Sequence, residues 1–370
     1  MDRGRDAGLA EREAIKAAFL EDAGLADAER QPLPGDASTR RYERLVRPDG
    51  ATFILMDAPP AAESRPCPPT ASADDRREAG YNALARLAAG RVDAFAAAAG
   101  YLKANGLSAP DILAVDVDQG LAVTEDLGEG VYARLIEQGA DERELYFAAI
   151  DALAQLHGRT PPQILTTKGA EWPLLAYDNL ALKTGADLFV EWYPKFDPRV
   201  AVDDLAVEEW EALWAPIRER GDAGATVFAH RDYHAENLLW LPKREGAARV
   251  GMVDFQDALR AHPTWDLHSL LQDARRDVSP ELEAAALDRY FEQRPETDRE
   301  RFLDDYAALA ALNEARILGI FARLIVRDHK PRYQAFMPRL WRHLNRNLER
   351  PGMEGLKLWF RVHVPSEARA

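Results

Sequence analysis

The fold is decided by two stretches of sequence, VFAHRDYHAEN at residues 227–237 and MVDFQD at residues 252–257. Each stretch begins with apolar, β-prone residues and ends in polar side chains, which predicts two short strands that lead into loops. Asn237 follows Asp232 by five positions, and Asp254 ends the second apolar run. We therefore expect the two strand ends to bring Asp232, Asn237 and Asp254 together.

These three residue types suit phosphoryl transfer to a hydroxyl group. One carboxylate, here Asp232, must face the hydroxyl and take its proton. Mg²⁺ neutralises the triphosphate of ATP and takes oxygen ligands, here the amide oxygen of Asn237 and the carboxylate of Asp254. Positioning and charge compensation supply most of the rate in such reactions. The residues therefore predict an ATP- and Mg²⁺-dependent kinase.

The spacing resembles that of protein kinases, in which H-R-D-x-x-x-x-N is followed by a D-F-G metal site. Here Asp254 is followed by Phe255 and Gln256. The segment is most similar to the aminoglycoside phosphotransferase-like kinases, the small-molecule branch of the protein-kinase-like fold. Further fragments resemble a narrower group, the bacterial anomeric kinases for N-acetylmuramate and N-acetylglucosamine. These fragments are GDAS (35–38) with RRY (40–42), LMDAPP (55–60), TEDLG (124–128), EWY (191–193), DFQDA (254–258), and DL (266–267) with Asp273.

The resemblance implies an α+β, two-lobed protein-kinase-like fold. Residues 1–124 would form a small, β-rich, nucleotide-binding lobe, residues 125–130 a hinge, and residues 131–370 a larger helical lobe that holds the catalytic and metal-binding loops and the substrate site. The order of β-type and helical patterns along the chain agrees with this arrangement.

Periodicity gives the expected elements. We expect strands at 41–46, 52–56, 112–117 and 121–124, a mobile loop at 57–78, and β islands at 225–229 and 249–253 within an otherwise helical C-terminal part. The expected helices are 10–28, 92–105, 141–157, 206–220, 281–293, 300–327 and 332–349.

The resemblance also implies the nucleotide contacts. The turn with Asp36, Ser38 and Thr39 would cover the ATP phosphates, since backbone N–H groups of such turns bind phosphate oxygens. Backbone groups of the hinge residues Glu125 and Leu127 would meet the adenine edge.

One departure from the protein-kinase pattern is the missing phosphate-binding lysine. The strand at residues 52–57, TFILMD, contains none. Arg40 and Arg41 are both candidates for the replacing cation, and the sequence does not choose between them. The resemblance further implies that Asp266 braces the catalytic loop, and His230 and Arg231 are expected to be structural.

We expect the acceptor to be a sugar. Glu191 and Trp192 lie between expected helical segments and combine a carboxylate with an aromatic face, as sugar sites do. The alternative interpretation is a carboxylate on the surface and an aromatic side chain in the core. Gln256 and Asp257 adjoin the metal carboxylate and are further candidates for acceptor contacts. The charged cluster at residues 273–277 is expected to be a solvated helix end.

The composition narrows the function class. The 370 residues carry a net charge of −15, which disfavours nucleic acid and anionic lipid as partners. The single cysteine, Cys67, excludes an internal disulfide, and no apolar run of about 18 residues predicts a membrane span. We expect a cytoplasmic protein, and its oligomeric state stays open.

The expected reaction is phosphorylation of the anomeric hydroxyl of N-acetylmuramate or N-acetylglucosamine, as the resemblance implies. Alternatives are another small hydroxyl acceptor, such as an aminoglycoside, choline or homoserine, or a catalytically inert kinase-like interaction module. A zinc site at His230 and His234 is disfavoured because no third ligand has suitable spacing.

Overall fold

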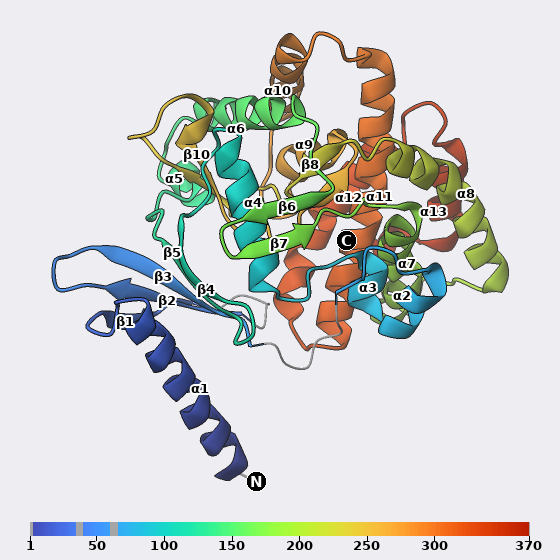
Figure 1. The fold of residues 1–370 in the computed structure, drawn as a ribbon. Coiled ribbons are helices and arrows are strands. Elements are labelled where there is room, and N and C mark those ends of the chain that lie inside the picture. Colours follow the sequence, from blue (N-terminus) through green and yellow to red (C-terminus); the bar gives the residue numbers. More distant parts are fainter. Residues whose placement is uncertain (1–2, 35–39, 60–65, 370) are drawn as a thin grey trace.

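The computed structural model describes residues 3–34, 40–59 and 66–369. An antiparallel sheet lies on the left of Figure 1, beside a larger and mostly helical part, which confirms the α+β class. The strand order of this sheet is β1-β2-β3-β5-β4. Its strands are β1 (Glu29–Pro32), β2 (Arg41–Val46), β3 (Thr52–Asp57), β4 (Ile112–Asp116) and β5 (Leu121–Glu125).

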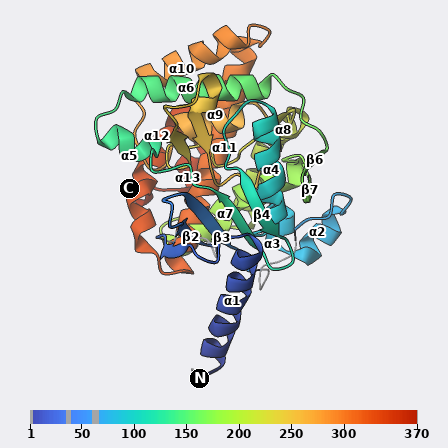
Figure 2. The ribbon, with the colours of Figure 1, turned by 60° about the vertical axis from the view of Figure 1, so that its left-hand side comes forward.

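One face of the sheet packs on the first helix, α1 (Arg3–Asp22). Side chains alternate along a strand, so Leu45 of β2, Leu55 of β3 and Val123 of β5 share this face and bury against Leu20 of α1. Ion pairs between α1 and the sheet flank this apolar contact. The N-terminal half of α1 extends beyond the sheet in both ribbon views (Figures 1 and 2).

The opposite face of the sheet turns toward the helical part. Tyr42, Met56 and Thr124 alternate with the α1-facing residues and lie on this inner face. Met56 belongs to a core cluster that continues through Phe95 of α4 (Val92–Ala104) to Phe255. The rings of Phe95 and Phe255 stack at 4.7 Å, which ties the sheet side of the molecule to the segment after Asp254.

Helices make up most of the larger part, which also holds three two-stranded sheets among the described residues. The strand pairs are β6 (Ile164–Thr167) with β7 (Ala170–Pro173), β8 (Val227–Ala229) with β11 (Leu259–Ala261), and β9 (Leu238–Trp240) with β10 (Val250–Met252). The helices are α2 (Ala73–Ala79), α3 (Tyr81–Ala85), α5 (Tyr132–Glu137), α6 (Glu142–His157), α7 (Asn179–Phe196), α8 (Asp204–Ala223), α9 (Thr264–Leu271), α10 (Pro280–Gln293), α11 (Arg299–Val326), α12 (Met337–Asn347) and α13 (Glu354–His363).

Several sequence expectations need correction. The helix expected at 10–28 ends at Asp22, because Gly24 adopts a left-handed φ of 71° that terminates it. The loop expected at 57–78 contains the start of α2, which a capping box between Ser72 and Asp75 begins. The strand pair β6–β7 and the helix α7 were not expected.

The expected lobe boundary at residue 124 stays a prediction. Helices α2, α3 and α4 precede that residue, yet α3 packs on α7, and α4 packs on β6 and β7. Helices α3 and α4 therefore contact the larger, mostly helical part although they precede the expected boundary in sequence.

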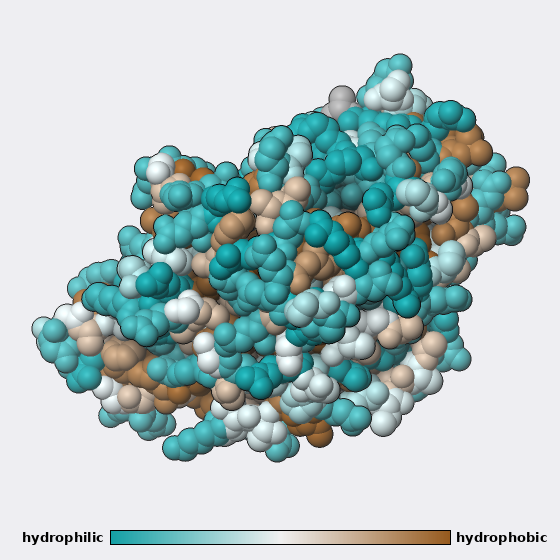
Figure 3. Space-filling view, turned by 90° about the horizontal axis from the view of Figure 1, so that it is seen from above, coloured by the Kyte–Doolittle hydropathy of each residue, from teal (hydrophilic) through white to brown (hydrophobic). Residues whose placement is uncertain are grey.

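The surface seen from above in Figure 3 is mostly hydrophilic, with hydrophobic residues in small separate groups. Among the described residues, no helix is long and apolar enough to cross a membrane.

Helices α11 and α7 approach each other closely at Gly319. A Cβ added to Gly319 of α11 would lie 2.3 Å from the carbonyl carbon of Leu188. Gly319→Ala should therefore force the helices apart and lower the free energy of unfolding by about 1–3 kcal/mol, as overpacking does. Urea denaturation followed by circular dichroism measures this change.

The matched control is Gly8→Ala on the solvent-exposed part of α1, where nothing lies within 4 Å of the added Cβ. Alanine favours helix over glycine, so this variant should be as stable as the parent or slightly more stable. An unchanged unfolding midpoint for Gly319→Ala would contradict the packing argument.

Candidate active site

The loop between β8 and β9 carries Asp232, and a buried carboxylate holds the start of this loop. Asp266, in the first turn of α9, accepts hydrogen bonds from the peptide N–H groups of His230 (2.7 Å) and Arg231 (2.9 Å). Burial raises the pKa of the Asp266 carboxyl to about 7, although the two N–H groups favour its charged form. The expected bracing role of Asp266 is thereby confirmed.

Arg231 has a structural role. Its backbone adopts a left-handed φ of 79°, which a non-glycine residue holds only when its surroundings fix it. Its guanidinium donates to the carbonyl oxygens of Ala85 (2.9 Å) and Arg86 (3.1 Å) and lies over the ring of Tyr177. The side chain therefore joins the end of α3 to the catalytic loop.

His230 is buried, and burial lowers the pKa of its imidazole to about 4. The ring is neutral at pH 7 and packs edge-on against Tyr233 and Phe255. These contacts agree with the structural role expected for this histidine.

The two expected metal ligands line one cavity. The amide nitrogen of Asn237 donates to the backbone carbonyl of Asp232 (2.9 Å), which leaves its amide oxygen as the atom for a cation. The Asp254 backbone has a left-handed φ of 64°, and its Oδ1 accepts from Arg40 (2.6 Å) and Gln256 (3.2 Å). An amide oxygen beside a carboxylate is the donor set that Mg²⁺ prefers, so these residues fit the ion.

This cavity, of about 420 Å³, lies between the inner face of the sheet, the segment after β5 and the catalytic loop. Apolar side chains from both sides suit a purine base: Leu33, Ile54, Met56, Leu127, Leu239 and Val253. The polar groups Arg40, Asn237 and Asp254 line the same cavity and suit phosphates and their metal ion.

The expected hinge residues Glu125 and Leu127 both line this cavity. The peptide N–H of Glu125 donates to the carbonyl of Asp111 (2.8 Å), so this N–H is engaged within the protein. The Glu125 carboxylate accepts from the Arg244 guanidinium (2.5 Å) and the Asp111 N–H (3.2 Å). These contacts anchor the connector to the segment between β9 and β10.

The structure separates the two candidates for the missing cation. Arg40 lines the cavity at Asp254 and is paired with that residue, whereas Arg41 lies at the start of β2 with an exposed side chain. The inner face of β3 presents Ile54 and Met56, which carry no charge. The expected phosphate-turn residues Asp36, Ser38 and Thr39 lie outside the described residues.

A second cavity, of about 180 Å³, contains Asp232. Burial and the neighbouring charges of Asp254 and Asp257 raise the pKa of the Asp232 carboxyl, while Arg316 and Arg231 lower it. The other lining residues are Arg231, His234, Ser269, Gln272, Asp273, Ala274, Arg275, Asn313, Arg316, Ile317, Ile320 and Phe321. Asp232 therefore lies beside the cavity at Asp254, to which Asn237 connects it, and lines a separate polar cavity.

The structure places Glu191 and Trp192 away from both cavities. They lie within α7 and not between helices, because the helix that the sequence interpretation missed runs from Asn179 to Phe196. Glu191 is exposed near Lys195, whose ammonium group lies over the Trp192 ring. Neither residue lines the space around Asp232.

The remaining acceptor candidates lie next to the metal carboxylate. The amide nitrogen of Gln256 donates to Asp254, and a carboxylate oxygen of Asp257 accepts from the N–H of Ala88 (2.6 Å). Both residues support the geometry around Asp254 and the segment after α3.

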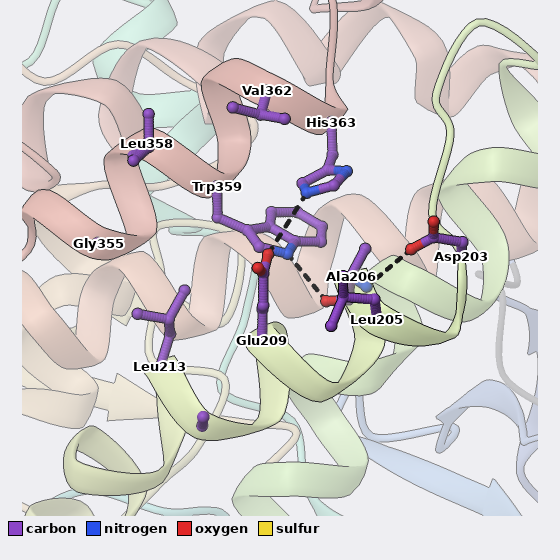
Figure 4. A pocket seen from close by; sticks show the side chains of 11 residues that line it. Asp203, Leu205, Ala206, Glu209, Leu213, Gly355, Leu358, Trp359, Val362 and His363 are labelled. Carbon is purple, nitrogen blue, oxygen red and sulfur yellow. Dashed lines mark hydrogen bonds and ion pairs between the residues drawn. The ribbon is translucent and has the colours of Figure 1, made fainter.

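Another cavity, between α8 and α13, has different chemistry (Figure 4). Its apolar walls are formed by Leu205, Leu213, Leu358 and Val362. The Nε2 atom of His363 lies 3.7 Å from a carboxylate oxygen of Glu209. None of the expected site residues lines this cavity. The cavity at Asp254, in contrast, combines two oxygen ligands suited to a metal ion with apolar walls suited to a purine base.

Residues 29–312 match the model of the phosphotransferase enzyme family. The chain belongs to this family. It is 61% identical to the N-acetylmuramate/N-acetylglucosamine kinase of Caulobacter vibrioides, over 97% of this chain and 98% of the relative. It is 30% identical to the kinase of the same name from Pseudomonas aeruginosa, over 86% and 83%.

Solved structures support the fold. A choline/ethanolamine kinase family protein from Mesorhizobium loti superposes with a TM-score of 0.55 at 17% identity, covering 95% of this chain and 99% of that protein. An ethanolamine kinase from Plasmodium vivax gives a TM-score of 0.54 at 12% identity, over 90% and 82%. The fold is thus that of the kinase-like phosphotransferases, and the chain is a phosphotransferase.

The sequence interpretation assigned no role in the site to two residues that line the Asp232 cavity. Asp273 was expected at a solvated helix end, but it is 3% exposed, and burial raises the pKa of its carboxyl to about 6. Arg316 lies inside a long helix with no motif around it. The spacing of Asn313, Arg316 and Ile317 on one helix face is a weak signal, since polar residues on a helix usually face water.

Arg40→Met tests the assignment of the phosphate-binding cation. Charge-assisted hydrogen bonds contribute about 1.5–3 kcal/mol, so the variant should lose about 10- to 100-fold in kcat/KM for ATP. Steady-state kinetics with varied ATP measures this loss.

The matched control is Arg41→Met, which removes the same side chain one position away, at an exposed site. It should keep kcat/KM for ATP within about twofold, as surface substitutions usually do. Equal losses in both variants would contradict the assignment.

Proposed function

We propose that this phosphotransferase moves the γ-phosphoryl group of ATP to the anomeric hydroxyl of N-acetylmuramate and N-acetylglucosamine, giving the sugar 1-phosphate, with Mg²⁺ as cofactor. The observation that carries the proposal is the position of Asp232, in a polar cavity next to a base-sized cavity with Asn237 and Asp254. The similarity to the Caulobacter vibrioides kinase, which extends over nearly the whole chain, supports the choice of sugars.

Each residue has a defined task in this proposal. Asp232 orients the sugar hydroxyl and accepts its proton. Asn237 and Asp254 hold Mg²⁺, which compensates phosphate charge when bound. Arg40 exchanges its ion pair with Asp254 for contacts with the ATP phosphates. It thereby supplies the positive charge that strand β3 lacks. We also assign phosphate contacts to Asp36, Ser38 and Thr39.

The hinge holds the base in this proposal. The N–H of Glu125 is engaged by Asp111, so its carbonyl and the N–H of Leu127 are the groups we assign to the adenine edge. Residues 1–124 and 131–370 move relative to each other about residues 125–130 when ATP binds. Because ATP is a cytoplasmic substrate, we place the reaction in the cytoplasm.

The charges that line the Asp232 cavity, which we call the acceptor cavity, disfavour an aminoglycoside as substrate. Arg231, Arg275 and Arg316 line it together with only two carboxylates, Asp232 and Asp273. A polycationic acceptor needs an excess of negative charge around it. A neutral or acidic sugar suits this mixture better.

Phosphorus NMR of the reaction mixture tests acceptor and position together. With ATP, Mg²⁺ and either sugar, the product phosphorus should couple to the anomeric proton. Asp232→Asn should lower kcat by about 100- to 10,000-fold, the usual contribution of a general base.

The control variant is Asp288→Asn, which changes a half-exposed carboxylate paired with Arg299 on the surface. It should keep full activity. Turnover of choline or an aminoglycoside but neither sugar would reject the proposed acceptor, and an active Asp232→Asn would reject the proposed base.

A further inference from the structure

Three arginines line the acceptor cavity, and two of them already have partners. Arg231 donates to the carbonyl oxygens of Ala85 and Arg86. Arg275 lies 3.1 Å from a carboxylate oxygen of Glu236. Arg316 forms one hydrogen bond, to the amide oxygen of Asn313 (3.0 Å), and no carboxylate of the described residues lies within 4.0 Å of it. Among the described residues, Arg316 is therefore the one of the three whose partner is a single neutral side-chain amide, which leaves most of its five N–H donors for a ligand.

The position of Arg316 is built by the two packed helices α7 and α11. A Cβ on Gly185 of α7 would lie 3.0 Å from the Arg316 Cδ, so this glycine makes room for the aliphatic stem. Asn313 is 6% exposed and lies one turn before Arg316 on the same face. Because its amide oxygen accepts from Arg316, its amide nitrogen is left as a donor beside the guanidinium.

The surroundings of this pair are mixed in charge and polarity. The charges of Asp232 and Asp257 act on the Arg316 guanidinium without forming an ion pair. Ile317, Ile320 and Phe321 continue the same face of α11 and form an apolar wall of the cavity. A ligand that reaches this place from Asp232 should therefore carry a carboxylate beside a small apolar group.

The two proposed sugars differ in such a group. N-acetylmuramate is N-acetylglucosamine with an ether-linked lactic acid, which carries a carboxylate and a methyl group. We propose that Arg316 and Asn313 form a carboxylate-binding subsite for this substituent, with the apolar wall of α11 beside the methyl group. N-acetylglucosamine leaves the subsite to water. This inference rests on the proposed function and adds the residues that distinguish its two substrates.

The test compares kcat/KM for the two sugars in the parent and in Arg316→Met, at saturating ATP. Loss of a charge-assisted hydrogen bond in this partly buried cavity should lower kcat/KM for N-acetylmuramate about 10- to 100-fold more than for N-acetylglucosamine. The control is Arg301→Met, on the same helix with 78% of its side chain exposed. It should leave the ratio of kcat/KM for N-acetylmuramate to kcat/KM for N-acetylglucosamine unchanged.

A second variant guards against a folding defect in the first. Asn313→Asp keeps the shape of the side chain but gives Arg316 a permanent counter-charge, so it should lower the same ratio. Equal losses for both sugars in the two variants would overturn the subsite, since they would show that Arg316 acts on Asp232 alone. If the parent enzyme used neither sugar, the proposed function would fall first, and the subsite with it.

Discussion

The buried carboxylate of Asp266 is the constraint on which the catalytic site depends. It binds two successive N–H groups, those of His230 and Arg231, and so fixes the backbone immediately before Asp232. Arg231 needs this support because its left-handed backbone is unfavourable for a side chain of its size. Strand β8 pairs with β11, and Asp266 binds the two residues that follow β8. Together these contacts fix the backbone position of Asp232.

A second constraint is the charge that gathers around Asp232. Burial raises the pKa of its carboxyl, Asp254 and Asp257 raise it further, and Arg316 and Arg231 oppose them. Arg40 pairs with Asp254 at the boundary between the sheet and the catalytic loop. The site thus contains carboxylates that favour a divalent cation, together with arginines whose partners would change when phosphates or an acidic sugar bind.

The sequence predicted the parts of this site that follow one another in the chain. Asp232, Asn237 and Asp254 follow short apolar runs, and fixed spacing was enough to recognise them. Arg316 and Asp273 reach the site through contacts between distant helices, which the sequence does not show. The charge of Asp273 suggested solvent, but packing buries its side chain. Glu191 and Trp192 were misplaced because α7 contains Gly185 and Pro194, which weaken a helical pattern in the sequence. The choice between Arg40 and Arg41 depends on which face of the sheet each side chain occupies. That face is known only once the register of β2 against β3 is known.

A crystal structure with ADP and Mn²⁺ in place of Mg²⁺ tests the central claim most directly, because Mn²⁺ is located by its anomalous scattering. The account predicts the ion between the Asn237 amide oxygen and the Asp254 carboxylate, with the base between Met56 and Leu239 and with Arg40 on the phosphates. An ion or a nucleotide bound elsewhere, with Asn237 and Asp254 contacting neither, would contradict it.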